Sequence, residues 1–366
     1  MLINSIELEN FRNYELEMFA FSENVNVITG ENAQGKTNLL EAVYLLTGSK
    51  SWRTRFDREL IRIGADFASI KAQVFCQERD QKLEMLFRRG QRRKISKNGV
   101  NKTSSELMGT INAVLFCPDD LNIVRSGAAV RRRFMDAALC QLRPKYEEML
   151  QRYNKLYEHK SACLKQLKEY PDIPVPLEEI NQQMCALDAR IIRYRASFIR
   201  RIAEKAAEIH AEFSGNREKL EIEYHTVSTV TDPLAPAGDI YEQVMAHQLS
   251  HMKAECESMS CLTGIHKDDA EIFINSLPAR QFASQGQART AALSLKMAER
   301  LLFLEETGEP PILLLDDVLS ELDEKRQEFV LNHMTGGQTF ITCCEGAEIA
   351  SRTGGRVITI ENGRGI

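Results

Sequence analysis

The chain has 366 residues, of which 43% are hydrophobic, and carries a formal net charge of −5. This length and apolar content suffice for more than one hydrophobic core, which predicts one split head domain with a second domain inserted into it. No apolar run approaches the roughly 18 residues that a membrane-spanning helix needs, and the N-terminus has no charged-then-apolar export signal, so we expect a cytoplasmic protein without a membrane partner. The nine cysteines form no CxxC pair, which favours reduced thiols over disulfides or a zinc site.

A phosphate-binding loop follows an apolar strand that the sequence predicts at residues 25–29. The pattern is Gly30-x-x-x-x-Gly35-Lys36-Thr37, which is typical of nucleoside triphosphatases. The glycines let the loop wrap a phosphate with backbone N–H groups, and the helix that begins near Lys36 directs the positive end of its dipole at the anion. Lys36 is expected to neutralise the β- and γ-phosphates of ATP or GTP, and the Thr37 hydroxyl to ligate Mg²⁺. The predicted cofactor-binding residues of this segment are Gly30, Glu31, Asn32, Ala33, Gln34, Gly35, Lys36, Thr37 and Asn38.

Basic residues gather in the next part of the chain, where strands are predicted at residues 66–76 and 82–88. Residues 82–102 include eight basic side chains and one acidic side chain, and Asn98-Gly99 is a typical hairpin turn. A basic hairpin on the head can contact nucleic-acid phosphates without reading sequence, although a solvated surface hairpin accounts for the same pattern. A second basic stretch flanks Trp52. The predicted DNA-binding residues are Arg53, Arg88, Arg89, Arg92, Arg93 and Lys94.

A long helical segment is predicted from Ser126 onward. Apolar residues at helical spacing occur between residues 149 and 167 and again between 177 and 209, on either side of a proline-rich break at residues 171–176. Two helices of about 30 to 40 residues, at a rise of about 1.5 Å per residue, would form an antiparallel hairpin about 45 to 60 Å long. Beyond this arm, the sequence predicts a strand at residues 219–227, a helix at 239–257 and a strand at 271–278.

A turn of small residues at positions 283–287 opens a long amphipathic helix. Ser284 suits the N-cap of this helix, and Gly286 permits the close approach of another backbone or of a ligand. Taken alone, the segment is equally well explained as an ordinary capped helix. Its chemical meaning therefore depends on the rest of the chain.

A short buried strand is predicted at residues 312–315, directly before Asp316 and Asp317. In nucleoside triphosphatases, a strand of a parallel sheet delivers a Mg²⁺-organising aspartate beside the phosphate loop. Asp316 is expected to hold the metal through water, and Asp317 to orient or deprotonate the attacking water, so that these two acids and Lys36 are the predicted catalytic residues. Two acids after an apolar run can instead cap the following element, an alternative that the phosphate loop weakens. The long interval between the two motifs implies that the sheet closes around a large insertion.

The Ser284 turn precedes the Asp316 strand by about thirty residues, and residues 319–323 read Leu-Ser-Glu-Leu-Asp. This arrangement resembles ATPases of the ABC type, in their SMC-like branch, where such a turn grips the γ-phosphate on a partner subunit and such a loop crosses the dimer interface. The resemblance implies an ATP-induced homodimer with nucleotide contacts from Ser284, Gly286, Gln287 and Asp323. It also implies an α/β fold, an ABC-type ATPase head with a mixed sheet built from N- and C-terminal segments and an inserted, mainly helical arm domain. The predicted parts are 1–120 for the N-terminal head, 121–215 for the arm, and 216–366 for a return segment and the C-terminal head.

Further blocks are more specific than the ATPase motifs. They read Leu-Glu-Asn-Phe-Arg-Asn-Tyr at 8–14, Val-Leu-Phe-Cys-Pro-Asp-Asp-Leu at 114–121, Arg-Arg-Arg-Phe-Met-Asp at 131–136 and Gly-Ile-His-Lys-Asp-Asp at 264–269. In this order they resemble the RecF family over essentially the whole chain. The resemblance implies an ATP-dependent protein that binds double-stranded, single-stranded, gapped or junction DNA, with weak DNA-stimulated ATPase activity and with ATP and Mg²⁺ as cofactors. It further implies action with RecR and RecO in loading RecA at gaps, and a nucleotide contact by Arg12.

Other function classes fit the phosphate loop alone. A kinase that acts on a small molecule would need an acceptor pocket and no Ser284 turn. A transporter ATPase subunit would be expected to carry a switch histidine after the last core strand, which this sequence lacks, and no γ-phosphate-sensing histidine or Gln-loop residue is predicted here. A scaffold with a degenerate site is disfavoured because Lys36, Thr37, Asp316 and Asp317 are all present.

Overall fold

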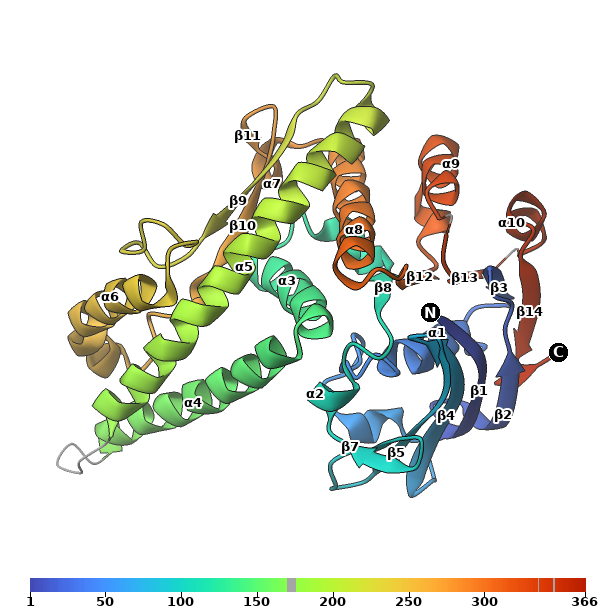
Figure 1. Cartoon of the computed structure of the whole chain (residues 1–366), viewed down its shortest axis with the longest axis horizontal. Coiled ribbons are helices and arrows are strands. Elements are labelled where there is room, and N and C mark those ends of the chain that lie inside the picture. The colour runs from blue at the N-terminus through green and yellow to red at the C-terminus, as the bar shows by residue number, and fades with distance from the viewer. Residues whose placement is uncertain (170–175, 335, 345) are drawn as a thin grey trace. The chain divides into compact units, whose positions relative to one another are not determined.

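The computed structural model describes residues 1–169, 176–334, 336–344 and 346–366. The chain forms two compact units (Figure 1): the first unit combines Met1–Asn122 with Ala292–Ile366, and the second unit is Ile123–Ala291. The sequence-based division grouped residues 216–291 with the C-terminal head, whereas in the structure they cluster with the second unit; that three-part division stays a prediction. Apart from Pro176, the proline-rich break lies outside the described residues.

A six-stranded mixed sheet in the first unit joins the two ends of the chain. Its strand order is β15-β14-β3-β13-β12-β8, and all neighbours are parallel except β14 and β15. Because β13 lies between β3 and β12, the loop after β3 and the aspartate that ends β12 meet at one edge of the sheet. The predicted head, built from N- and C-terminal segments, is confirmed. Its strands are β3 (Val25–Thr29), β8 (Ala113–Phe116), β12 (Ile312–Asp316), β13 (Thr339–Cys343), β14 (Arg356–Glu361) and β15 (Arg364–Gly365).

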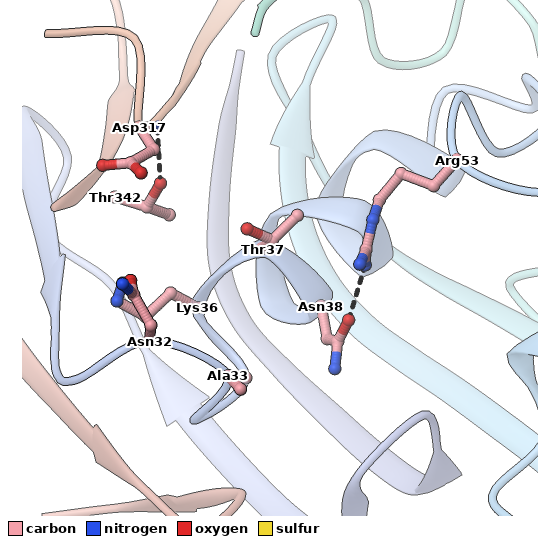
Figure 2. A pocket seen from close by; sticks show the side chains of 9 residues that line it. Asn32, Ala33, Lys36, Thr37, Asn38, Arg53, Asp317 and Thr342 are labelled. Carbon is pink, nitrogen blue, oxygen red and sulfur yellow. Dashed lines mark hydrogen bonds between the residues drawn. The ribbon is translucent and has the colours of Figure 1, made fainter. Parts of the chain in front are cut away.

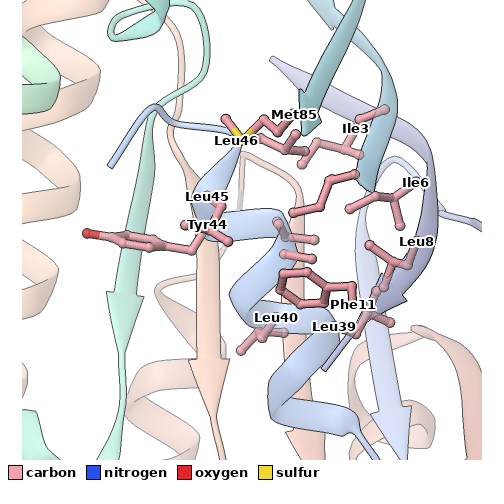
Figure 3. Close-up of a cluster of buried hydrophobic side chains, with 14 of the residues drawn as sticks. Ile3, Ile6, Leu8, Phe11, Leu39, Leu40, Tyr44, Leu45, Leu46 and Met85 are labelled. Atoms are coloured by element: carbon pink, nitrogen blue, oxygen red, sulfur yellow. The ribbon is translucent and has the colours of Figure 1, made fainter. Parts of the chain in front are cut away.

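An antiparallel sheet of six strands, in the order β2-β1-β4-β5-β6-β7, completes the first unit. Figure 3 shows Ile6, Leu8 and Phe11 of this sheet in one buried cluster with Leu39 of helix α1 (Lys36–Leu45). Burial of nearly all of α1 fixes the helix whose first turn carries the predicted phosphate and metal ligands. The strands are β1 (Leu2–Phe11), β2 (Tyr14–Ala20), β4 (Phe67–Cys76), β5 (Arg79–Arg88), β6 (Lys94–Lys97) and β7 (Val100–Lys102).

The basic segment forms the outer strands β5, β6 and β7 of the antiparallel sheet. The predicted strands at residues 66–76 and 82–88 are confirmed as β4 and β5, and β5 begins three residues earlier than expected. Asn98 and Gly99 connect β6 to β7 with φ values of 52° and 77°. Because the type I′ hairpin turn has positive φ at both of its central positions, the predicted Asn98-Gly99 turn is confirmed. The other helices of this unit are α2 (Ser104–Leu107), α9 (Glu324–Asn332) and α10 (Gly346–Thr353).

The second unit combines long helices with a three-stranded antiparallel sheet in the order β11-β10-β9. The first predicted arm helix is divided at Pro144, because proline starts a helix readily but cannot continue one. The predicted strand at 271–278 is wrong as a single strand: the chain reverses at Asn275 and Ser276, which both have positive φ. None of the helices in the described part of the chain has the length and apolar character of a membrane span. The elements are α3 (Ala128–Leu142), α4 (Pro144–Glu169), α5 (Leu177–Ser214), β9 (Leu220–His225), α6 (Ala237–Ser258), β10 (Asp269–Ile274), β11 (Leu277–Pro278) and α7 (Ala279–Phe282), while α8 (Gln285–Thr307) has residues in both units.

Two of the sequence blocks that resemble the RecF family meet in the core of the second unit. Arg195 of α5 is 2% exposed and donates to Asp136 at 2.9 and 3.0 Å and to Asp268 at 2.8 Å. Arg131 makes a bidentate ion pair with Asp269, at 2.7 and 2.8 Å. A buried carboxylate is tolerated only when it is paired and hydrogen-bonded. The blocks at 131–136 and 264–269 are therefore joined to each other, directly and through Arg195, by ion pairs within the second unit.

The loop between β3 and α1 depends on two glycines. Gly30 has φ 146° and Gly35 has φ 126°, values that residues with a side chain rarely adopt. A Cβ atom on Gly30 would lie 2.3 Å from the carbonyl oxygen of Ile360, and one on Gly35 would lie 2.8 Å from the side-chain nitrogen of Asn13. Both conformation and space thus require glycine at the ends of the loop.

We expect Gly30→Ala to lower the free energy of unfolding by about 3 kcal/mol or more, because it adds a clash with a backbone carbonyl to an unfavourable φ. Gly99→Ala is the matched control, since Gly99 also has positive φ but no atom within 4 Å of its would-be Cβ, and it should cost only about 1–2 kcal/mol. Urea denaturation followed by circular dichroism measures both. Equal losses in the two variants would contradict the steric part of this account.

Candidate nucleotide-binding site

A cavity of about 320 Å³ opens where the loop after β3 meets the residues that follow β12 (Figure 2). Its wall is formed by Asn32, Ala33, Gly35, Lys36, Thr37, Asn38, Arg53, Asp317 and Thr342. The structure thus brings the predicted phosphate loop together with Asp317. Gly30, Glu31 and Gln34 belong to the same loop but do not line the cavity; their backbone carbonyls accept hydrogen bonds from the side chains of Lys36 and Asn13.

The Lys36 side chain is folded over its own loop. Its Nζ donates to the carbonyl oxygens of Gly30 at 2.6 Å and Glu31 at 2.8 Å, and lies 3.8 Å from the Sγ of Cys344. Charged phosphate oxygens are stronger acceptors than these neutral carbonyls. Phosphate oxygens can therefore replace the carbonyl oxygens of Gly30 and Glu31 as hydrogen-bond acceptors of the Lys36 ammonium group.

Thr37, Asp316 and Thr342 form a polar cluster beside the cavity. The Oδ1 atom of Asp316 accepts hydrogen bonds from Thr37 Oγ1 at 2.8 Å and from Thr342 Oγ1 at 2.9 Å. Burial raises the pKa of Asp316 above its usual range, while the two hydroxyl donors act in the opposite direction. A carboxylate beside a hydroxyl is an oxygen set that suits Mg²⁺. The residues present therefore fit the predicted metal, which Thr37 would ligate directly and Asp316 through water.

Asp317 turns the chain at the end of β12. Its φ of 52° is left-handed, which costs a residue with a side chain about 1–2 kcal/mol. The turn is held by its N–H group, which donates to Thr342 Oγ1 at 2.9 Å, and by Ser320 Oγ, which donates to its carbonyl oxygen at 2.6 Å. As a result, Asp316 faces Thr37 while Asp317 lines the cavity. The two acids lie in different environments, as two different chemical roles require.

Thr342 is a site residue that the sequence analysis missed. Its hydroxyl links both acids, because it donates to Asp316 and accepts from the N–H group of Asp317. The run Thr-Phe-Ile-Thr-Cys at residues 339–343 has the character of a buried strand, which is the only local signal. The pairing of Asp316 with Thr342 across β12 and β13 is what brings it to the site.

Two arginines lie differently from their predicted places. Arg12, a predicted nucleotide contact, does not line the cavity; its guanidinium donates to both carboxylate oxygens of Glu41, at 2.7 and 2.8 Å, and to the carbonyl oxygen of Glu59 at 2.9 Å. Arg53, which the sequence analysis grouped with the DNA-binding residues, does line it. The structure therefore favours Arg53 for the nucleotide, and a nucleotide contact by Arg12 stays a prediction.

Two other predicted nucleotide contacts cap helices. Ser284 Oγ accepts from the N–H group of Gln287 at 3.2 Å, and Gln287 Oε1 accepts from the N–H group of Ser284 at 2.8 Å, which confirms the predicted N-cap of α8. Asp323 Oδ1 accepts from the N–H group of Arg326 at 2.9 Å and caps α9. The Ser284 turn is exposed and belongs to the second unit. Nucleotide contacts by Ser284, Gly286, Gln287 and Asp323 stay predictions.

Four of the predicted DNA-binding side chains are exposed around the connection between β5 and β6: Arg88, Arg89, Arg92 and Lys94. Arg93 differs from them. Its guanidinium donates to both carboxylate oxygens of Asp57, at 2.9 and 3.0 Å, and to the carbonyl oxygen of Ser49 at 2.9 Å, and its side chain is 10% exposed. The charge of Arg93 is compensated by Asp57. Its contacts with Ser49 and Asp57 connect it to the segment that carries Arg53, which explains Arg93 better than a DNA contact does.

The chain is similar to known proteins over its whole length. The family model described as RecF/RecN/SMC N terminal domain matches residues 2–354. The DNA replication and repair protein RecF of Acetivibrio thermocellus is 39% identical, over 100% of this chain and 99% of the relative. The protein of the same name from Bacillus subtilis is 40% identical, over 93% of each chain.

Solved structures show the same agreement. A structure described as the recombination mediator protein RecF-ATP in the RecFOR pathway superposes with a TM-score of 0.91 at 32% identity, over 100% of this chain and 96% of the other. An Smc head domain from Pyrococcus furiosus shares the fold, with a TM-score of 0.56 at 15% identity, over 99% and 94%. From its sequence and its structure, the chain belongs to the RecF family.

Proposed function

We propose that this chain is an ATP-dependent DNA-binding protein of recombinational gap repair. The observation that carries the proposal is the 2.8 Å hydrogen bond between Thr37 and Asp316, which assembles the phosphate-binding and metal-binding halves of a triphosphatase site. Relatives named DNA replication and repair protein and a neighbour described as RecF-ATP in the RecFOR pathway support it. We further propose that the protein acts in the cytoplasm with RecR and RecO and helps to load RecA on single-stranded DNA.

ATP is proposed to bind with its triphosphate along the loop at residues 30–37. The backbone N–H groups of this loop and the first turn of α1 stabilise the anion, and Lys36 moves from the carbonyls of Gly30 and Glu31 to the phosphate oxygens. When bound, Mg²⁺ supplies charge neutralisation of the phosphates. Thr37 and Asp316 are the residues that would hold it in place.

Hydrolysis is proposed to be slow and to act as a release switch. Asp317 lines the cavity and is the candidate that orients or deprotonates the attacking water. Many ABC-type ATPases carry a glutamate at this position, and the aspartate is one methylene shorter. A misplacement of about 1 Å can cost on the order of a hundredfold in rate. A slow ATPase suits a protein that must stay on DNA while its partners assemble.

The second half of the nucleotide contact is proposed to come from another copy of the chain. The Ser284 turn is exposed and is pre-organised by its capping box, and it carries Gly286 and Gln287 at the start of α8. Placed over the γ-phosphate of a partner, together with the partner-facing loop that contains Asp323, this turn makes ATP a ligand of both copies. Such a ligand stabilises the dimer by mass action.

We expect Ser284→Arg to abolish the ATP-dependent dimer, because a bulky side chain blocks the turn, while ATP binding by the monomer stays close to that of the parent. Sedimentation velocity with and without ATP and Mg²⁺ measures the dimer. Thr103→Arg is the matched control, since Thr103 caps α2 with a similar capping box and is not a predicted nucleotide contact. Persistence of the ATP-dependent dimer in Ser284→Arg would reject the shared site.

DNA is proposed to contact the exposed basic side chains at the β5–β6 connection. Arg88 and Lys94 flank the β5–β6 connection, Arg89 and Arg92 lie within it, and all four are exposed. Their salt-dependent attraction to phosphates needs no sequence recognition. The cluster is local, so the acidic net charge of the whole chain does not prevent it from forming a basic surface.

We expect the triple substitution Arg88→Gln, Arg92→Gln and Lys94→Gln to weaken DNA binding for all sequences. The slope of log K against log salt should become shallower by up to about three units, because three phosphate contacts are lost. A control triple variant neutralises Arg193, Lys219 and Lys253, which are exposed in the second unit. Fluorescence anisotropy over a salt series measures both, and a slope equal to that of the control would leave the β5–β6 connection as a solvated surface.

A further inference from the structure

Glu41 is a buried acid that the predicted ATPase motifs do not explain. It lies on α1, five residues after Lys36, and its side chain is 0% exposed. Its neighbours on the helix are the apolar residues of the core, where an unpaired carboxylate would be strongly unfavourable. The acid is therefore expected to have a partner whose position it controls.

Glu41 binds guanidinium groups from two separate segments of the chain. Arg12, at the end of β1, donates to both carboxylate oxygens at 2.7 and 2.8 Å. Arg53 donates through Nη1 to Oε2 at 3.3 Å, and Ser51 Oγ donates to the other carboxylate oxygen. One carboxylate thus fixes both β1 and the segment that carries Arg53 to the helix of the phosphate loop.

The two arginines are held to different extents. The Arg12 guanidinium is held by a bidentate pair with Glu41 and by the carbonyl oxygen of Glu59, whereas the Arg53 side chain is 38% exposed and lines the cavity. Arg53 Nη1 also donates to Asn38 Oδ1 at 2.6 Å (Figure 2). Arg53 is therefore oriented from inside the protein while its guanidinium still faces the ligand space.

A chain of hydrogen bonds continues from Arg53 to the phosphate loop itself. Asn38 Nδ2 donates to Asn13 Oδ1 at 2.8 Å, and Asn13 Nδ2 donates to the carbonyl oxygen of Gln34 at 2.7 Å. Each amide in this chain uses its oxygen as acceptor and its nitrogen as donor. The position of Arg53 is thereby coupled to the shape of the loop as well as to Glu41.

We propose that Glu41 is a positioning residue for nucleotide binding, which holds the Arg53 guanidinium at the wall of the phosphate-loop cavity so that it contacts the phosphates of the nucleotide. The proposal rests on the proposed ATP-binding function and adds two residues to it. It also explains why the chain buries an acid in the helix that follows the phosphate loop. A planar guanidinium suits phosphate oxygens because it donates two parallel hydrogen bonds.

The test is a double-mutant cycle on ATP affinity, measured by isothermal titration with Mg²⁺. Arg53→Ala and Glu41→Gln should each weaken ATP binding by about tenfold, and the double variant should bind no more weakly than Arg53→Ala alone, because Glu41 acts through Arg53. Glu41→Asp, which keeps the charge, should recover part of the loss. The proposal would be overturned if the loss of ATP affinity in the double variant equalled the product of the two single-variant losses. Wild-type ATP affinity in either single variant would also overturn it.

Two controls separate this proposal from a loss of folding and from the proposed function. Glu7→Gln removes another paired carboxylate of the first unit, which accepts from Lys71 at 2.7 Å, and should leave ATP affinity unchanged. If Glu41→Gln does not fold, the cycle is run with Glu41→Asp and Arg53→Ala in its place, with the same two outcomes. Lys36→Ala tests the ATP site itself. If the parent chain does not bind ATP, the proposed function is rejected. If ATP binding is lost in Lys36→Ala but unchanged in Arg53→Ala, only the role of Glu41 is rejected.

Discussion

The site depends on one contact, the hydrogen bond between Thr37 and Asp316, which are 279 positions apart in the chain. It forms only when β13 pairs with β3 on one side and with β12 on the other, so that both carboxyl ends reach the same edge of the sheet. Neither end of the chain alone supplies all the residues of the proposed phosphate and metal site. Residues 123–291 fold as their own compact unit between the two halves, which lets the head accept a large insertion without a change in this register.

Each charged group at the cavity already has a partner within the protein. Lys36 donates to loop carbonyls, Asp316 accepts from two hydroxyl groups, and Arg53 is shared between Glu41 and Asn38. The partners of Lys36 are carbonyl oxygens of its own loop, which an anion can replace, whereas Arg53 is held by the buried carboxylate of Glu41. The same principle extends to the proposed dimer, in which the capped Ser284 turn needs no rearrangement before it meets a partner's nucleotide.

The parts of the fold that depend on local patterns were predictable from the sequence. The phosphate loop, the strand before Asp316 and the Asn98-Gly99 turn each need particular residues at short spacing, and the structure has all three. Features set by tertiary pairing were not predictable. Thr342 reaches the site only because β12 and β13 are neighbours in the sheet. Arg12 pairs with Glu41 instead of lining the cavity, and Arg53 lines the cavity beside the same acid. No local sequence pattern marks Glu41 as the buried acid that holds both arginines.

The most direct test of a working ATPase site is to separate binding from hydrolysis. Asp317→Asn and Lys36→Ala are compared with the parent in two assays, equilibrium ATP binding and single-turnover hydrolysis. Asp317→Asn should bind ATP like the parent and lose hydrolysis, because the amide cannot accept the proton of the attacking water, while Lys36→Ala should lose both. Hydrolysis by Asp317→Asn at the rate of the parent, or unchanged ATP binding by Lys36→Ala, would contradict the account.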